Sequence, residues 1–79
     1  MNIKSLVNFS FKNIELIKQA STCGCYHCCD IFESKDIIQF TDDGKTALCP
    51  KCHVDAVLGD KSGFEITKNF LTEAKKYWF

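Results

Sequence analysis

Two Cys-x-x-Cys motifs limit what this chain can fold into more than any of its other features. Residues 25–28 read Cys-Tyr-His-Cys and residues 49–52 read Cys-Pro-Lys-Cys, with 20 residues between the two motifs. Each motif is typical of a knuckle, a tight turn that directs two sulfurs to one point, and two knuckles together supply the four ligands of a tetrahedral zinc site. We therefore predict one structural Zn²⁺ with no open coordination position. Its predicted ligands are Cys25, Cys28, Cys49 and Cys52.

The length of the chain makes a stabilising metal ion important. A chain of 79 residues is close to the size at which a hydrophobic core alone gives marginal stability. Its composition is 46% hydrophobic, with seven Phe, two Tyr and one Trp, which is typical of a globular protein and not of a disordered one. Metal binding then contributes to folding, on the order of 10 kcal/mol in small zinc domains. We predict a single zinc-binding domain over residues 1–79, with an N-terminal helix at 10–21, a zinc module at 22–60 and a C-terminal helix at 66–78.

Six cysteines in so short a chain indicate either a secreted disulfide scaffold or an intracellular metal-binding domain. The first eight residues include Lys4 and Asn8, and they contain neither an uninterrupted apolar run nor a small-residue cleavage site. No stretch approaches the roughly 20 apolar residues of a membrane span. We therefore expect a cytoplasmic protein with reduced cysteines and no membrane association.

Both predicted helices carry an apolar stripe that we expect to pack on the zinc module. In the first helix, Ser10 is the predicted N-cap, and Phe11, Ile14 and Ile17 recur every three residues. In the last helix the apolar residues fall largely on one face. They are Ile66, Phe70, Leu71, Ala74, Tyr77 and Trp78.

A β-hairpin is predicted between the two motifs. Residues 36–40 are strand-like, residues 41–44 form a turn with an Asp-Gly step, and residues 45–48 return as a second strand. Zinc ribbons and treble clefs share this skeleton, and they differ after the second motif, where a ribbon has a strand and a treble clef has a helix. Asp55 could cap a helical turn that Gly59 ends, so both alternatives stay open. The predicted fold class is a small α+β metal-stapled domain of the zinc-ribbon or treble-clef type, with one helix on each side.

Three further segments accompany these motifs. Residues 46–52 read Thr-Ala-Leu-Cys-Pro-x-Cys, and residues 54–60 read Val-Asp-x-Val-x-Gly-Asp. The chain ends with Ile-Thr-x-x-Phe-Leu at 66–71 and Tyr-Trp-Phe at 77–79. Over about residues 13–79 the chain resembles a family of short bacterial cytoplasmic proteins with a zinc-ribbon core and no characterised function. It departs from the ribbon pattern at His53, because zinc ribbons commonly have glycine directly after the second knuckle.

Two cysteines and two histidines lie beside the predicted ligands. Cys23 is an alternative ligand and Cys29 a candidate redox thiol, although free cysteine most often packs as a small apolar side chain. His27 and His53 could each donate an N–H group to a zinc-bound sulfur, and surface exposure is the alternative for both. For the cluster itself, the alternatives are a rubredoxin-like iron centre with the same spacing and four thiols without a metal.

The charge distribution bears on the kind of partner. Residues 23–60 carry a net charge of −4, each flanking segment carries +2, and the chain contains no arginine. Zinc held by four thiolates adds a formal charge of about −2 to the middle segment. Proteins that read duplex nucleic acid usually have a basic face with arginine forks, so the acidic zinc module disfavours this function.

We therefore predict a non-enzymatic, zinc-stabilised module that binds a protein partner as an adaptor, regulator or inhibitor. Core packing is the default for the final aromatic residues, and exposed aromatics are also favoured partner contacts. These candidate contacts are Tyr77, Trp78 and Phe79. The alternative is a nucleic-acid-binding zinc ribbon in which Tyr26, Phe40 or Trp78 stack on bases. A thiol or metal redox protein is the second alternative, and the sequence contains no nucleophile–base pair and indicates no small-molecule substrate.

Overall fold

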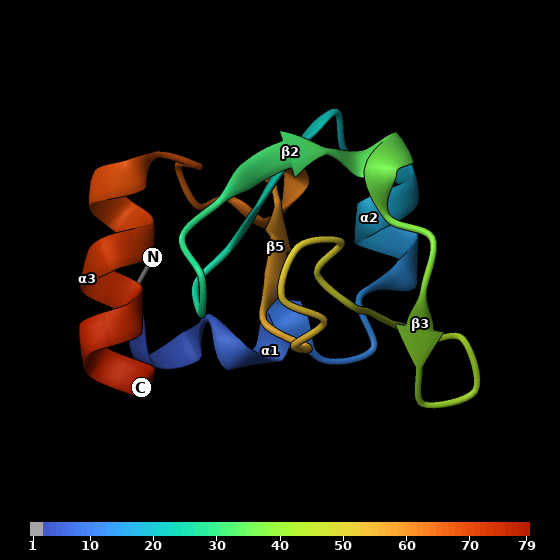
Figure 1. Cartoon of the computed structure of the whole chain (residues 1–79), viewed down its shortest axis with the longest axis horizontal. Helices are drawn as coiled ribbons and strands as arrows, with labels where there is room; N and C mark the ends of the chain where they lie inside the picture. Colours follow the sequence, from blue (N-terminus) through green and yellow to red (C-terminus); the bar gives the residue numbers. More distant parts are fainter. Residues whose placement is uncertain (1–2) are drawn as a thin grey trace.

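A three-stranded antiparallel sheet lies between helical segments that come from both ends of the chain, and a two-stranded sheet lies at one edge of the molecule (Figure 1). The computed structural model describes residues 3–79. The helices are α1 (Val7–Ser10), α2 (Ile14–Gln19) and α3 (Lys68–Trp78), with 3-10 turns at Ile3–Ser5, Ser34–Asp36 and Asp60–Ser62. The strands are β1 (Thr22–Cys25), β2 (Ile31–Glu33), β3 (Phe40–Thr41), β4 (Thr46–Ala47) and β5 (Val57–Gly59). The predicted small α+β class is confirmed.

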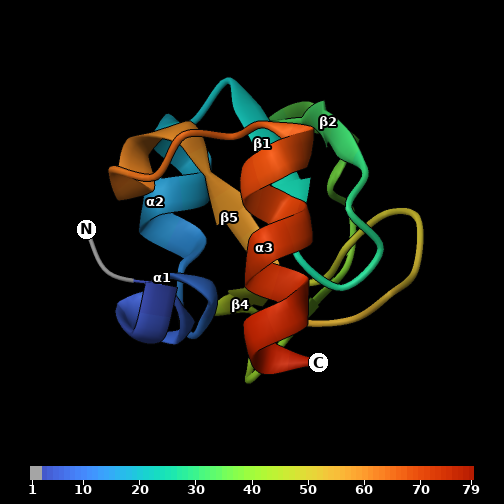
Figure 2. The ribbon, with the colours of Figure 1, turned by 90° about the vertical axis from the view of Figure 1, so that its left-hand side faces the viewer.

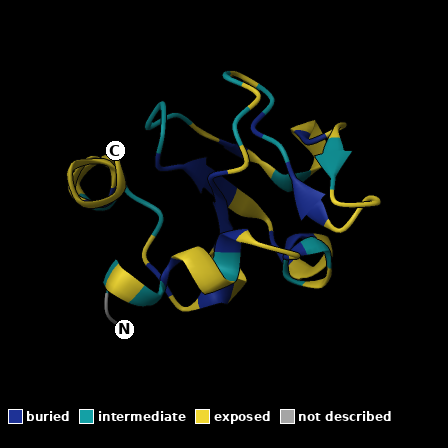
Figure 3. Cartoon of the chain, turned by 90° about the horizontal axis from the view of Figure 1, so that it is seen from below, coloured by how far each residue is buried: buried dark blue, intermediate teal, exposed yellow. Residues whose placement is uncertain are grey.

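The larger sheet has the order β2-β1-β5, with β1 paired antiparallel to both neighbours. Cys23 is at its centre, opposite Phe32 on one side and Gly59 on the other. Figure 3 shows β5 and most of β1 buried, whereas the outer surfaces of the helices are exposed. No helix in the described part of the chain is long and apolar enough to cross a membrane.

The N-terminal helix differs from the prediction, because residues 10–21 do not form one continuous helix. Ser10 is the last residue of α1, and the chain leaves the helical path at Phe11 and Lys12, whose φ values are −101° and 50°. The break is held by contacts with distant residues: the Ser10 and Tyr26 hydroxyls are 2.8 Å apart, and Lys12 N–H donates to Thr46 Oγ1 at 2.8 Å. As a result Phe11 points away from the core and is 53% exposed.

Asn13 connects the two sheets. Its side-chain Nδ2 donates to the Val57 carbonyl in β5 at 2.9 Å, and its Oδ1 accepts from the Ala47 N–H in β4 at 3.1 Å. The residue is buried, so these are the partners that replace water for its amide group. Periodicity does not reveal this role, because a polar residue between Phe11 and Ile14 is equally typical of the exposed face of a helix.

The predicted hairpin is present between the motifs, but its strands are shorter than expected. β3 begins only at Phe40, and Ile38 is 81% exposed. The turn at residues 42–44 has three consecutive residues with positive φ, and the Thr41 carbonyl accepts from the N–H groups of Gly44 and Lys45.

After the second motif the chain forms strand β5 and no helix. Of the two alternatives that the sequence leaves open here, the strand is the one present, and Asp55 does not cap a helical turn that ends at Gly59. The 3-10 turn that follows β5 begins at Asp60, whose carboxylate accepts from the backbone N–H groups of Ser21 and Thr22, both at 3.2 Å. This contact ties the end of β5 to the start of β1.

Helix α3 begins at Lys68, two residues later than predicted, because Thr67 caps it by accepting the Phe70 N–H at 3.1 Å. The helix lies across the sheet beside β1 and β5 (Figure 2). It approaches β1 closely at Gly24, where a Cβ atom would be 2.8 Å from Leu71 Cδ1. Gly24 is therefore needed for the close packing of α3 on the strand that enters the first knuckle.

Replacing Asn13 by Ala tests the connection between the sheets. We expect Asn13→Ala to lower the free energy of unfolding by about 2–4 kcal/mol, because it leaves the Val57 carbonyl and the Ala47 N–H buried without partners. Chemical denaturation of the metal-loaded protein measures this change. Asn69→Ala, at an exposed position of α3, is the matched control and should change stability by less than about 0.5 kcal/mol.

Candidate metal centre

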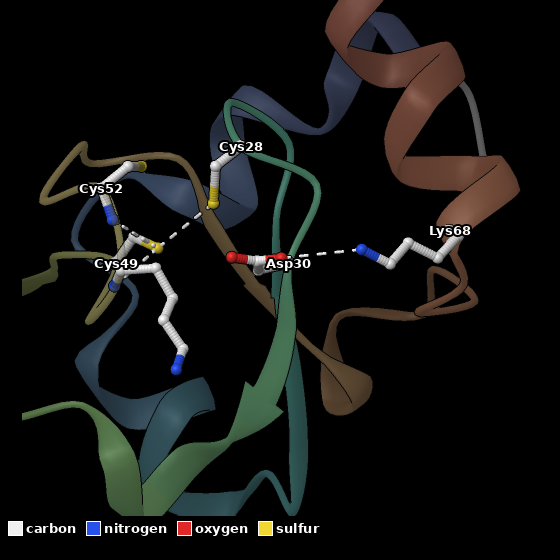
Figure 4. Close-up of polar contacts among 6 residues, drawn as sticks. Cys28, Asp30, Cys49, Cys52 and Lys68 are labelled. Carbon is white, nitrogen blue, oxygen red and sulfur yellow. Dashed lines mark hydrogen bonds and ion pairs between the residues drawn. The ribbon is translucent and has the colours of Figure 1, made fainter.

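The structure brings the four predicted ligands together. The sulfur atoms of Cys25, Cys28, Cys49 and Cys52 all lie within 4.8 Å of one another. Between the knuckles, the sulfurs of Cys25 and Cys52 are 3.6 Å apart. Those of Cys28 and Cys49 are 3.7 Å apart (Figure 4). A tetrahedral ion with metal–sulfur bonds of about 2.3 Å requires sulfurs about 3.8 Å apart. The two distances between the knuckles match this value, so the cluster is compatible with a four-thiolate metal site.

The first knuckle joins β1 to β2. Cys25 is the last residue of β1, its N–H donates to the Asp30 carbonyl at 3.0 Å, and its own carbonyl accepts the Cys29 N–H at 2.8 Å. The chain reverses direction at Cys29, which has a left-handed conformation with φ of 65°. Cys29 therefore occupies the position that closes the turn.

The second knuckle repeats this geometry between β4 and β5. The Cys49 N–H donates to the Val54 carbonyl at 3.0 Å, and the Cys49 carbonyl accepts the His53 N–H at 2.9 Å. His53 also has φ of 65°. The residue directly after each motif thus adopts the left-handed conformation that favours glycine. This chain has His53 and Cys29 at these two positions instead.

Backbone amides donate to the sulfurs from inside the knuckles. The His27 N–H is 3.3 Å from Cys25 Sγ, and the N–H groups of Lys51 and Cys52 are 3.3 and 3.4 Å from Cys49 Sγ. Such donors stabilise the thiolate that binds a metal. The sequence predicts that the side chains of His27 and His53 donate to the sulfurs, whereas these donors are main-chain N–H groups.

The thiols of the cluster differ in how readily they lose a proton. Burial raises the pKa of Cys25, and burial also raises the pKa of Cys28 to about 11. At Cys49 burial acts in the same direction, but hydrogen bonds from the N–H groups of Cys52 and Lys51 and from the thiols of Cys28 and Cys52 together lower the pKa. The surroundings therefore favour the thiolate form at Cys49 and disfavour it at Cys25 and Cys28.

The other candidate residues lie around the cluster. Cys23 is fully buried beside Gly59, and burial together with the nearby Asp60 carboxylate raises its pKa to about 12. It packs as a small apolar side chain. The His53 ring is exposed, and the His27 ring packs edge-on against Phe79, with ring centres 4.7 Å apart. Within residues 3–79, His27 Nδ1 is buried without a hydrogen-bond partner.

The final aromatic residues are more exposed than core packing predicts. Tyr77, Trp78 and Phe79 are 49%, 37% and 62% exposed. Each nevertheless has a contact: the Tyr77 and Trp78 rings are 5.2 Å apart, Trp78 Nε1 donates to the Ile3 carbonyl at 3.0 Å, and Phe79 lies against the first knuckle. These residues form the aromatic end of α3.

Comparisons with known proteins do not identify a relative. No protein-family model matches the chain, and no curated protein or solved structure matches it significantly. The resemblance to short bacterial zinc-ribbon proteins therefore stays a prediction.

Substitutions at His53 test the left-handed position. We expect His53→Gly to raise the free energy of unfolding of the metal-loaded protein by up to about 1 kcal/mol, because glycine adopts this conformation without steric cost. His53→Val should lower it by at least about 1 kcal/mol, because β-branched residues fit this region poorly. Lys51→Gly, an exposed knuckle position without positive φ, is the control and should be neutral or slightly destabilising. An identical effect of glycine at both positions would contradict this explanation.

Proposed function

We propose that the four-cysteine cluster holds one structural Zn²⁺ and that the chain is a zinc-stapled module. The observation that carries this proposal is the pair of sulfur–sulfur distances of 3.6 and 3.7 Å between the knuckles. Zinc binds thiolates in this geometry, and four protein sulfurs leave no coordination position for a substrate. Among zinc folds, strand β5 after the second knuckle supports a ribbon-like arrangement over a treble clef.

We further propose that the module is non-enzymatic and binds a protein partner in the cytoplasm. The closed ligand set supports a structural ion, since catalytic zinc keeps one position for water or substrate. The aromatic end of α3 supports the choice of partner, because Tyr and Trp are enriched among the residues that dominate protein interfaces. Lys75 and Lys76 are exposed next to these rings, so an acidic protein surface would complement them.

Nucleic-acid binding is supported less well. Tyr26, a candidate for stacking on bases, is buried, and its hydroxyl is 2.8 Å from that of Ser10. The acidic charge of residues 23–60 also lies in the segment that contains both knuckles. Phosphate groups would therefore approach a negatively charged metal centre, which costs affinity.

Metal analysis of the purified protein tests the proposed ion. We expect one zinc per chain and no colour, whereas an iron centre would be coloured. Cys49→Ser should abolish stoichiometric zinc binding and most of the far-ultraviolet circular dichroism signal, because metal binding supplies much of the folding free energy. Cys23→Ala, which removes a buried thiol outside the cluster, should keep one zinc per chain. A folded Cys49→Ser protein without metal would disprove a structural zinc.

Affinity capture with an N-terminally tagged full chain tests the proposed partner. We expect a stoichiometric protein that remains bound after nuclease treatment of the lysate. Tyr77→Asp should weaken capture at least about 10-fold, because it places a charge among the exposed aromatic rings. Ile38→Asp alters another exposed apolar residue, near the start of β3, and should leave capture unchanged. Loss of all bound material after nuclease treatment would favour the nucleic-acid alternative.

A further inference from the structure

The two knuckles are held very differently by the rest of the protein. In each motif, two residues lie between the ligating cysteines. In the second knuckle these are Pro50 and Lys51, and Lys51 is exposed. In the first knuckle they are Tyr26 and His27, and both contact segments that are distant in sequence.

Tyr26 anchors the first knuckle on two sides. Its hydroxyl is 2.8 Å from the Ser10 hydroxyl at the end of α1, and its N–H donates to the Ala56 carbonyl, directly before β5, at 3.0 Å. It is only 4% exposed. These contacts fix Tyr26 in the turn. They do not involve His27, the next residue of the motif.

Phe79 packs on both His27 and Tyr26. Its ring lies edge-on to His27 with ring centres 4.7 Å apart, and it lies 5.8 Å from the Tyr26 ring. The Phe79 N–H donates to the Lys75 carbonyl at 2.7 Å, so the last turn of α3 sets the position of the ring. At the other end of the same helix, Lys68 pairs with Asp30, two residues beyond Cys28, at 3.6 Å (Figure 4). Both ends of α3 therefore contact the first knuckle.

We infer that Phe79 is a positioning residue for the metal centre: by packing on His27 and Tyr26 it keeps the first knuckle in the geometry that binds the ion. The inference rests on the proposed zinc site. The His27 N–H donates to Cys25 Sγ at 3.3 Å, so a shift of His27 changes a contact made directly to a ligand atom. Cys28, the other ligand of this knuckle, is half-buried and follows His27 directly in the turn.

The expected coupling follows from thermodynamic linkage. If docking of the aromatic ring favours the closed knuckle by some factor, the closed knuckle is also the form that binds the metal. Removing the ring must then weaken metal binding by that factor. The exposed ion pair between Lys68 and Asp30 contributes little, because both side chains are well solvated. The coupling is therefore assigned to the aromatic contact.

The rate of zinc transfer to a coloured chelator tests this inference on the full-length, zinc-loaded protein. We expect Phe79→Ala to release zinc roughly 3- to 10-fold faster than the wild type, the range that one aromatic contact supplies. Phe79→Tyr keeps the ring and should keep the wild-type rate. Tyr77→Ala removes a ring of the same helix end, which contacts Trp78 instead of the knuckle, and should leave the rate unchanged.

A double-mutant cycle separates this role from general stability. If the contact carries the effect, Phe79→Ala should add little to the release rate of His27→Ala, because each change removes the same interaction. Equal release rates for Phe79→Ala, Tyr77→Ala and the wild type, all with one bound zinc, would overturn the positioning role and leave the zinc site intact. A wild-type protein that binds no zinc would overturn both proposals. If Phe79→Ala does not fold, the rate of His27→Ala decides, since a wild-type rate there contradicts the inference.

Discussion

The convergence of four cysteine sulfurs on one point is the constraint on which the rest of this structure depends. The strands are two to four residues long, and sheets of such short strands are not stable alone in water. The first knuckle joins β1 to β2, and the second lies between β4 and β5. The metal ion that we propose for both knuckles would fix the strands that emerge from them. A hydrogen bond from the Tyr26 N–H to the Ala56 carbonyl also joins the first knuckle to the residue before β5.

The main chain supplies much of what the knuckles need. In each of them a carbonyl of the first cysteine accepts the N–H group of the residue after the motif, and that residue is left-handed. This arrangement turns further N–H groups toward the sulfurs and favours their thiolate form. At Cys29 and His53 the turns therefore depend on the left-handed backbone conformation more than on a contact of the side chain.

The terminal segments complete the fold through a few specific contacts. Asn13 joins the two sheets, the Asp60 carboxylate binds the start of β1, and Gly24 lets α3 approach that strand. Asn13 and Asp60 each bond to a residue at least 34 positions away in the sequence. Gly24 lies where β1 meets the distant helix α3. The contacts of Asp60 and Gly24 involve β1, and those of Asn13 involve β4 and β5, so the terminal segments pack around the strands next to the two knuckles. The aromatic end of α3 is consequently both exposed to solvent and in contact with the knuckle.

The sequence by itself determined the four-cysteine cluster, the α+β class, the turn at residues 41–44 and the approximate extent of α3. Motif spacing, turn residues and helical periodicity are local signals, and each can be recognised without its partners in space. Only the tertiary structure decided that α1 and α2 are separate, that a strand follows the second knuckle, and that Phe79 packs on His27. The helix break illustrates the reason: the stripe of Phe11, Ile14 and Ile17 satisfies a helical period, but the partners of Ser10, Lys12 and Asn13 come from the knuckle and the strands. The periodicity of a local segment carries no information on hydrogen bonds to residues that are distant in the sequence. Here those hydrogen bonds break the helix that the periodicity predicts.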